Sequence, residues 1–276
     1  MSKVFTVRLK PLYGESLSGY ILSVALANGI DFDEILKMVT IISHKIISKR
    51  NSPYIIDFSP FTKIDLRILA SLTGITQDIL EGMTFLNLYR KFTDIMDSKT
   101  CIKSGITKKR IIKDHRQFCP YCLREHSGFK LIWQISDIEI CDVHSTKLIS
   151  HCTECGRQQP YVSNKIAELK CTNCDTNLHQ MEVSQIQNKE VVNEQLKFYK
   201  YWEFLLKPHL TLCNLIKGMS KEKSLIITFF YACQLGKKEF KLDSVIKLFH
   251  YKFAYELLEC VYDRESPTQI GRASCR

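Results

Sequence analysis

The sequence predicts a mainly α-helical protein with a small cysteine-rich module of β elements in its middle. Apolar residues recur at helical spacing in the first and last thirds of the chain, whereas cysteines recur at two-residue intervals between them. A chain of 276 residues with 45% hydrophobic and 25% charged residues, 11 Gly and 7 Pro is neither disordered nor fibrous in composition. Its length suits two or three small domains.

The chain contains no apolar run near the roughly 18 residues that a membrane-spanning helix needs. Its first residues, MSKVFTVRLKPLYGES, lack the apolar stretch and cleavage site of a secretory signal. We therefore expect a cytoplasmic protein with no membrane partner. In that compartment, 12 cysteines at tight spacings indicate metal ligands rather than disulfides.

Residues 1–98 are expected to form a helical domain. A turn at Pro11–Gly14 precedes a helix over Glu15–Asn28, and Gly29 provides a stop signal. The apolar face of this helix consists of Leu17, Tyr20, Ile21, Val24 and Ala27.

Two further helices are expected in this domain. Asp31 or Asp33 can cap a short helix that runs through Met38. Thr62 can cap a third helix, which Gly74 ends and whose apolar face consists of Leu66, Leu69 and Leu72.

The segment around Gly74 has the spacing of a helix-turn-helix motif. Ala70 lets a following helix approach closely, Gly74 takes the left-handed turn, and Leu80 lies six residues beyond it. Thr76 can cap the second helix, so Thr76 and Gln77 become candidate DNA contacts. The alternative is an ordinary helical hairpin, since this second helix is short and not strongly basic.

The net charge of +10 is concentrated in a linker, residues 99–117, and in the last third of the chain. The linker carries seven basic side chains and one acidic side chain. Clustered Lys and Arg release counterions from a nucleic-acid backbone, so phosphate contact is one interpretation and a solvated linker is the other. The candidate contacts are Lys99, Lys103, Lys108, Lys109, Arg110, Lys113 and Arg116.

Residues 118–180 contain two patterns of metal ligands, C-x2-C-x18-C-x2-H and C-x2-C-x15-C-x2-C. Two ligands on one tight turn can point at one ion, and two such turns complete the tetrahedron that zinc prefers. All four positions of each site are filled, so we expect two structural zinc ions in zinc-ribbon or treble-clef-like elements. The intervening stretch Phe129–Ile135 is expected to be a strand. The predicted ligands are Cys119, Cys122, Cys141 and His144 in the first site and Cys152, Cys155, Cys171 and Cys174 in the second.

An enzymatic alternative comes from the sequence Cys119-Pro-Tyr-Cys122, which also occurs in glutaredoxin-type thiol oxidoreductases. Such enzymes place the motif after a buried strand near the N-terminus of a βαβ fold, whereas here it follows a basic linker and precedes three more pairs. No H-x-E sequence precedes the cysteines, which argues against a zinc deaminase. We therefore expect no catalytic site.

Residues 188–262 are expected to form a C-terminal helical domain, with helices over Val191–Leu206, Leu225–Leu235 and Leu242–Leu258. Residues 266–276 abandon this pattern and end in IGRASCR. The codons ATC GGA AGA GCG TCG TGT AGG for this heptapeptide match a common sequencing adapter, so we interpret the tail as non-native and the helical domain as truncated. Genomic sequence with other codons followed by a stop would contradict this interpretation.

Four motifs in order resemble the TniQ/TnsD family of transposition target-selection proteins over roughly residues 1–180. They are Pro11-Leu-Tyr-Gly-Glu15-Ser16-Leu17-Ser18, the helical stretch 69–75, Phe118-Cys-Pro-Tyr-Cys-Leu123 followed by Trp133, and Cys141-x-x-His144-x-x-x-Leu148-x-x-x-Cys152-x-x-Cys155.

The resemblance implies a non-catalytic adaptor that recognises target DNA, directly or through a CRISPR guide-RNA complex, and recruits an AAA+ ATPase. It also implies the eight zinc ligands at their matching positions. The alternative outside this class is a zinc-containing transcription factor that binds DNA without an ATPase partner. Whether the chain forms a homodimer stays open.

Overall fold

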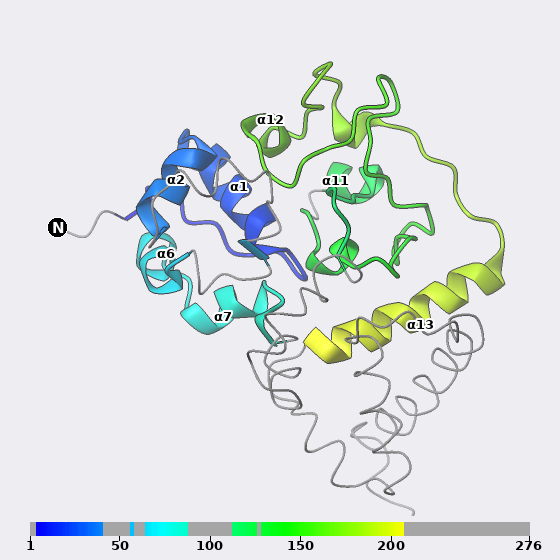
Figure 1. The fold of residues 1–276 in the computed structure, drawn as a ribbon, viewed down its shortest axis with the longest axis horizontal. Helices are drawn as coiled ribbons and strands as arrows, with labels where there is room; N and C mark the ends of the chain where they lie inside the picture. The colour runs from blue at the N-terminus through cyan, green and yellow to red at the C-terminus, as the bar shows by residue number, and fades with distance from the viewer. Residues whose placement is uncertain (1–3, 41–55, 58–63, 88–111, 126–127, 207–276) are drawn as a thin grey trace, which may run out of the picture. The chain divides into compact units, whose positions relative to one another are not determined.

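The computed structural model describes residues 4–40, 56–57, 64–87, 112–125 and 128–206 (Figure 1). These residues all lie within one compact unit, which comprises residues 1–90 and 108–208. Strand pairing in the described ranges is limited to isolated antiparallel bridges, so the expected mainly helical class is confirmed. The helical elements are α1 (Leu17–Asn28), α2 (Phe32–Val39), α6 (Leu66–Thr73), α7 (Gln77–Gly82), α11 (Pro120–Arg124), η1 (Leu131–Gln134), α12 (Asn164–Ala167), η2 (Leu178–Gln180) and α13 (Lys189–Leu206).

Several sequence-based expectations lie outside the described residues. They are the linker up to residue 111, the cap at Thr62, the tail 266–276, and the helices over Leu225–Leu235 and Leu242–Leu258.

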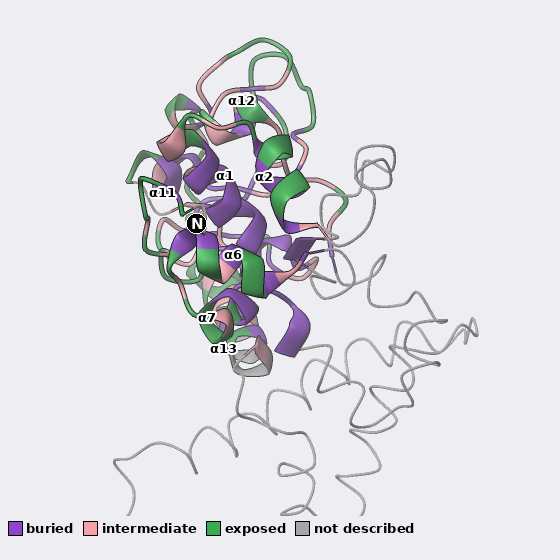
Figure 2. Cartoon of the chain, turned by 90° about the vertical axis from the view of Figure 1, so that its left-hand side faces the viewer, coloured by how far each residue is buried: buried purple, intermediate pink, exposed green. Residues whose placement is uncertain are grey.

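Helix α1 is the central element of the N-terminal helices and is buried along most of its length (Figure 2). The Ser16 hydroxyl accepts a hydrogen bond from the Gly19 amide at 3.1 Å, which satisfies one of the free donors of the first turn. Gly29 ends the helix in the left-handed conformation, with φ of 61°. The predicted helix over Glu15–Asn28 is therefore confirmed to within two residues.

Helices α6 and α7 form the hairpin in which the helix-turn-helix spacing was recognised. Gly74 takes a φ of 75° in the turn, and Leu80 is fully buried, as the spacing predicts. The start of α6 differs from the prediction, because the helix begins at Leu66 with Asp65 rather than Thr62 as its cap. The Asp65 carboxylate accepts a hydrogen bond from the Arg67 amide at 2.9 Å and thereby stabilises the first turn.

The segment predicted as a strand over Phe129–Ile135 is instead the 3₁₀ helix η1 between two bridge residues. Lys130 pairs with Glu15, and Ile135 pairs with Ile112. The four residues of η1 are all buried, so the alternation of buried and exposed side chains that favours a strand is absent. The periodicity of a short apolar run does not distinguish a buried strand from a buried helical segment, which explains the wrong prediction.

Helix α13, predicted over Val191–Leu206 and observed from Lys189, packs against the cysteine-rich region. The Tyr199 hydroxyl donates to the carbonyl of Ile140 at 2.8 Å, and burial raises the pKa of this phenol. The Gln195 side chain accepts from the amide of Glu139 at 2.8 Å. These contacts attach the helix next to the Cys141 turn, where one pair of predicted ligands lies.

A buried polar network joins the N-terminal helices to the cysteine-rich region. Arg116 is 1% exposed, and its guanidinium donates to the Ser18 hydroxyl at 2.8 Å and to the Tyr161 carbonyl at 2.5 Å. The Ser18 hydroxyl in turn donates to the Asp57 carboxylate at 2.6 Å, and Gln134 donates to the same carboxylate at 2.6 Å. Residues from four separate stretches of the chain therefore meet around one buried cation.

The charge in this network is supported by aromatic rings and by hydrogen bonds. The Arg116 guanidinium lies 4.3 Å from the centre of the Phe129 ring, a favourable cation–π arrangement. Burial lowers the pKa of Arg116 to about 10, so the group stays protonated at neutral pH. Burial raises the pKa of Asp57, while the hydrogen bonds from Ser18 and the charge of Arg116 act in the opposite direction.

Replacing Arg116 with Met should destabilise the protein by about 3–5 kcal/mol, because the buried Asp57 would lose its cationic partner. The measurement is urea unfolding followed by circular dichroism. Arg67→Met is the matched control, since Arg67 is 78% exposed and pairs with Asp65 at the surface, and it should change stability little. Equal destabilisation by the two substitutions would contradict the role given to the buried network.

Candidate metal centres

Three turns of the same shape carry six of the eight predicted ligands. In each turn the first ligand is a cysteine whose amide donates to the carbonyl five residues later, at 2.8–2.9 Å. The second ligand lies three residues after the first, and the next residue adopts a positive φ of 53–69°. An antiparallel bridge closes each turn. The bridges are Ile140–Lys147, His151–Gln158 and Lys170–Asn177, and the left-handed residues are Ser145, Gly156 and Asp175.

The fourth turn has a different form, because it opens helix α11. Cys119 precedes the helix and Cys122 lies in its first turn, with Pro120 at the first helical position. Proline suits that position, since its fixed φ matches the helix and its missing amide would have no partner there. The Cys-Pro-Tyr-Cys sequence therefore presents two sulfurs from one helix start.

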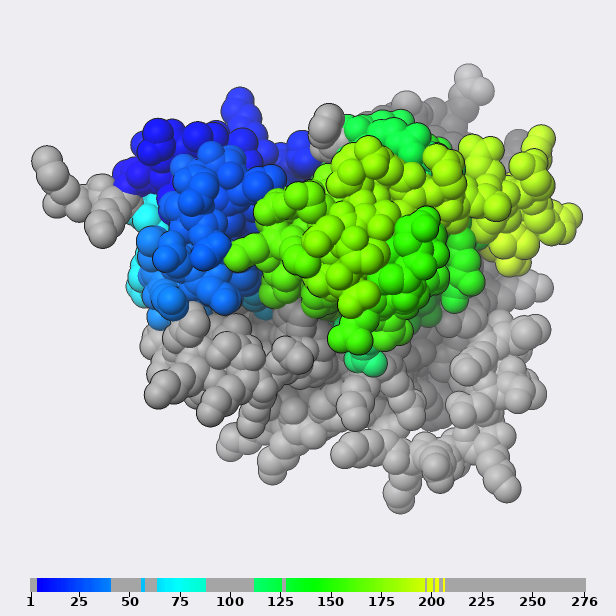
Figure 3. All heavy atoms as spheres, turned by 90° about the horizontal axis from the view of Figure 1, so that it is seen from above, coloured from blue at the N-terminus to red at the C-terminus, as the bar shows by residue number. Residues whose placement is uncertain are grey.

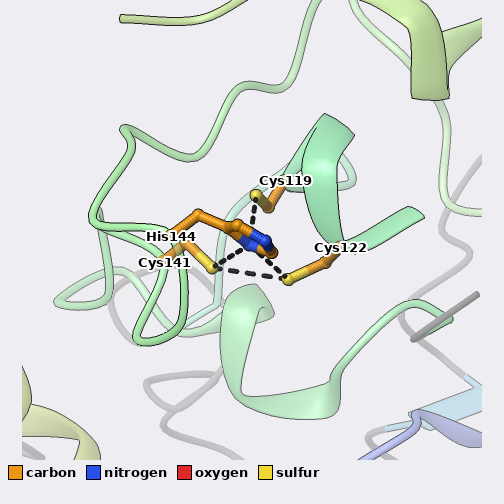
Figure 4. Close-up of side chains that lie close together, drawn as sticks. All are labelled: Cys119, Cys122, Cys141 and His144. Atoms are coloured by element: carbon orange, nitrogen blue, oxygen red, sulfur yellow. Dashed lines mark hydrogen bonds between the residues drawn. The ribbon is translucent and has the colours of Figure 1, made fainter. Parts of the chain in front are cut away.

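The first cluster brings together Cys119, Cys122, Cys141 and His144 (Figure 4). The His144 Nδ1 atom lies 3.6, 3.3 and 3.7 Å from the three sulfurs in that order. A zinc tetrahedron with Zn–S of about 2.3 Å and Zn–N of about 2.0–2.1 Å has sulfur–nitrogen edges of about 3.6 Å. The spacing of this cluster therefore fits a single zinc ion.

The imidazole of His144 is held in the orientation that such a site requires. Its Nε2 atom lies 3.1 Å from the Glu125 carboxylate, so Nε2–H can donate there and leave Nδ1 free for a metal. The Thr146 hydroxyl lies 3.4 Å from the Cys119 sulfur and provides a further contact to a ligand. Glu125 was not identified from the sequence, although its position three residues after Cys122 on the same short segment was a usable signal.

The second cluster consists of Cys152, Cys155, Cys171 and Cys174, contributed by two of the equivalent turns. The sulfurs of Cys152 and Cys174 are 3.6 Å apart, as are those of Cys155 and Cys171. A tetrahedral Zn(Cys)4 site has sulfur–sulfur edges of about 3.8 Å. Gln159 donates to the Cys171 sulfur at 3.3 Å, so this cluster also has a polar contact outside the ligand set.

The sulfurs of each cluster perturb one another's pKa values. Hydrogen bonds from Cys122 and Cys141 lower the pKa of the Cys119 thiol, while the pKa of Cys141 is raised to about 11. In the second cluster, the Thr176 hydroxyl lowers the pKa of Cys174 to about 6. Neighbouring thiolates repel one another, and a divalent cation would remove that repulsion. Both clusters could bind zinc.

The candidate DNA contacts fall into different environments. Thr76 is exposed at the start of α7, and the Gln77 amide donates to the Glu81 carboxylate at 2.8 Å. Arg116 lies in the buried network, so the prediction that it contacts phosphate is wrong. Its guanidinium is hydrogen-bonded to Ser18 and Tyr161 in the interior. Lys113 also points inward, donating to the Ile138 carbonyl, and burial lowers its pKa to about 8. The remaining candidates, Lys99, Lys103, Lys108, Lys109 and Arg110, lie outside the described residues.

The fold and the two clusters define a class of helical protein in which two cysteine-rich clusters that could bind metal accompany a short helical hairpin. The family model of TniQ matches residues 6–148, more than half of the chain. The chain therefore belongs to the TniQ family, whose members take part in Tn7-like transposition. The match includes the first cluster and ends before the second. No curated protein matches the chain.

Among the described residues, no helix is both long and apolar enough to cross a bilayer.

Replacing Cys119 or Cys171 with Ser should each remove about one zinc ion per chain, because each substitution leaves one cluster with three ligands. The measurement is metal content by inductively coupled plasma mass spectrometry, alongside circular dichroism. Cys213→Ser, outside both clusters, is the control and should leave the zinc content unchanged. Full zinc content in either ligand variant would contradict the ligand assignment.

Proposed function

We propose that this protein is a non-catalytic adaptor that selects target sites for a Tn7-like transposition system. The observation that carries the proposal is the TniQ match over residues 6–148. The adaptor recognises target DNA, directly or through a guide-RNA complex, and recruits an AAA+ ATPase that brings in the transposase.

The geometry of both clusters supports a structural role for two zinc ions. Each cluster offers four ligand atoms within 4.8 Å of one another, which fills a zinc tetrahedron and leaves no position for a catalytic water. Zinc bound by these residues holds together the turns that supply its ligands. We assign the ligands as predicted, Cys119, Cys122, Cys141 and His144 in one site and Cys152, Cys155, Cys171 and Cys174 in the other.

Contact with DNA is a separate part of the proposal. The surviving candidates are the basic run Lys99, Lys103, Lys108, Lys109 and Arg110, together with Thr76 and Gln77 on the α6–α7 hairpin. The support is the charge of the run and the exposure of Thr76 beside a glycine turn.

Affinity purification of the full chain with an AAA+ ATPase of a Tn7-like transposition system should yield a complex. The control is an unrelated AAA+ ATPase of similar charge, which should not be retained. Sequence-specific duplex binding without retention of the ATPase would instead support the transcription-factor alternative. Cleavage or joining of DNA by the purified chain would overturn the adaptor assignment.

Neutralising Lys108, Lys109 and Arg110 with Gln should flatten the salt dependence of duplex binding, because fewer counterions would be released. The measurement is the slope of log K against log salt by fluorescence anisotropy. The matched control replaces the exposed lysines Lys37, Lys147 and Lys200 with Gln, which removes the same charge elsewhere. Equal slopes in the two triple variants would instead support the interpretation of the basic run as a solvated linker that does not contact phosphate.

A further inference from the structure

The two clusters differ sharply in their access to solvent. In the first cluster, all three cysteines are buried and the His144 side chain is 16% exposed. In the second cluster, Cys155 and Cys174 are exposed, whereas Cys152 and Cys171 are fully buried. The second cluster therefore presents one exposed cysteine from each of its two turns.

Each exposed sulfur of the second cluster has a buried sulfur of the opposite turn beside it. Cys174 is 3.6 Å from Cys152, and Cys155 is 3.6 Å from Cys171. A disulfide needs sulfurs about 2.05 Å apart, so a shift of about 1.5 Å would join either pair. Exposed thiolates with a neighbouring cysteine that can form a disulfide are the groups that react most readily with peroxides.

We propose that the second cluster is a peroxide-reactive site that releases its metal on oxidation, while the first cluster keeps its own. The inference rests on the proposed zinc occupancy and goes beyond the adaptor role. Its basis is the exposure of Cys155 and Cys174 together with the buried sulfur that faces each of them.

The reaction is a two-electron oxidation of two sulfurs by hydrogen peroxide. The thiolate of Cys155 or Cys174 attacks one peroxide oxygen, the O–O bond breaks, and a sulfenic acid and hydroxide form. The buried thiolate of the opposite turn then attacks the sulfenic sulfur, forming the S–S bond and expelling a second hydroxide. Two protons convert the hydroxides to water, and the two remaining sulfurs are too few to retain zinc firmly.

Helix α12 connects this site to the N-terminal helices. It lies between the two turns of the second cluster, and Lys165 on it pairs with Asp175 of the second turn at 2.9 Å. Asn164 accepts a hydrogen bond from the Phe32 amide at 3.2 Å and donates to Asp31 at 2.8 Å. Asn164 thus caps α2, whose own N-cap residue makes no side-chain capping bond. Figure 3 shows this part of the chain lying directly against the N-terminal helices.

The test treats the zinc-loaded full chain with hydrogen peroxide and follows zinc release by the absorbance of 4-(2-pyridylazo)resorcinol. Zinc content is measured first, so that fewer than two ions per chain counts against the proposed occupancy rather than this inference. We expect one zinc to leave about tenfold faster than the other. Peptide mapping should then find a Cys152–Cys174 or Cys155–Cys171 disulfide and an unoxidised first cluster. Equal release rates, no release, or earlier oxidation of Cys119 and Cys122 would overturn the proposal.

Two double variants provide matched controls that keep four ligands. Cys155→His with Cys174→His removes the exposed sulfurs and should slow release to the rate of the first cluster. Cys152→His with Cys171→His leaves those sulfurs in place but removes the buried thiolates that form the disulfide, so peroxide should yield a sulfenic acid at Cys155 or Cys174 and neither of the two disulfides. The reverse order of sensitivity would contradict the assignment of the exposed cysteines as the reactive ones.

Hydrogen exchange at the Phe32 amide reports the link to α2. It should accelerate on oxidation, since displacement of Asn164 leaves this amide without its acceptor. Unchanged exchange in a fully oxidised chain would overturn the coupling.

Discussion

The buried charge of Arg116 is the constraint on which the arrangement of the described residues depends. An arginine removed from water must find hydrogen-bond acceptors and a compensating negative charge, or the fold that buries it is unstable. Ser18 from α1, the nearby carboxylate of Asp57 and the carbonyl of Tyr161 meet that requirement together. Helix α1 and the cysteine-rich region can satisfy this cation only when both occupy their observed places.

The polar network and the metal clusters hold complementary parts of the molecule. Each cluster brings together the turns that contribute its candidate ligands, but neither includes a residue of α1, α2, α6 or α7. Contacts through Arg116 and Asn164 connect those helices to the turns. The proposed adaptor role requires surfaces held in a fixed relation to one another, and these two contacts join the N-terminal helices to the turns.

The features that were predicted correctly from the sequence are those that depend on residues close together in the chain. The end of α1 at Gly29, the left-handed Gly74 and the two-residue spacing of the ligands are each decided within a few positions of the chain. The predictions failed where residues distant in sequence determine the environment or conformation of a residue. Arg116 belongs to a run of basic residues that resembles a solvated or phosphate-binding linker, and nothing near it in sequence reveals Ser18 or Asp57. The stretch predicted as a strand became η1 because it is buried on all sides, a property set by tertiary packing rather than by its own pattern.

The cap that Asn164 supplies to α2 has a consequence for synthesis of the chain. The amide of Phe32 precedes its acceptor by 132 residues, and Ser18 precedes Arg116 by 98. At a translation rate of about 5–20 residues per second, the N-terminal helices therefore wait on the order of ten seconds for these partners to be made. Until then the N-terminal helices lack the hydrogen-bond partners that Arg116 and Asn164 supply, so their final arrangement is completed only after residue 164 has been synthesised.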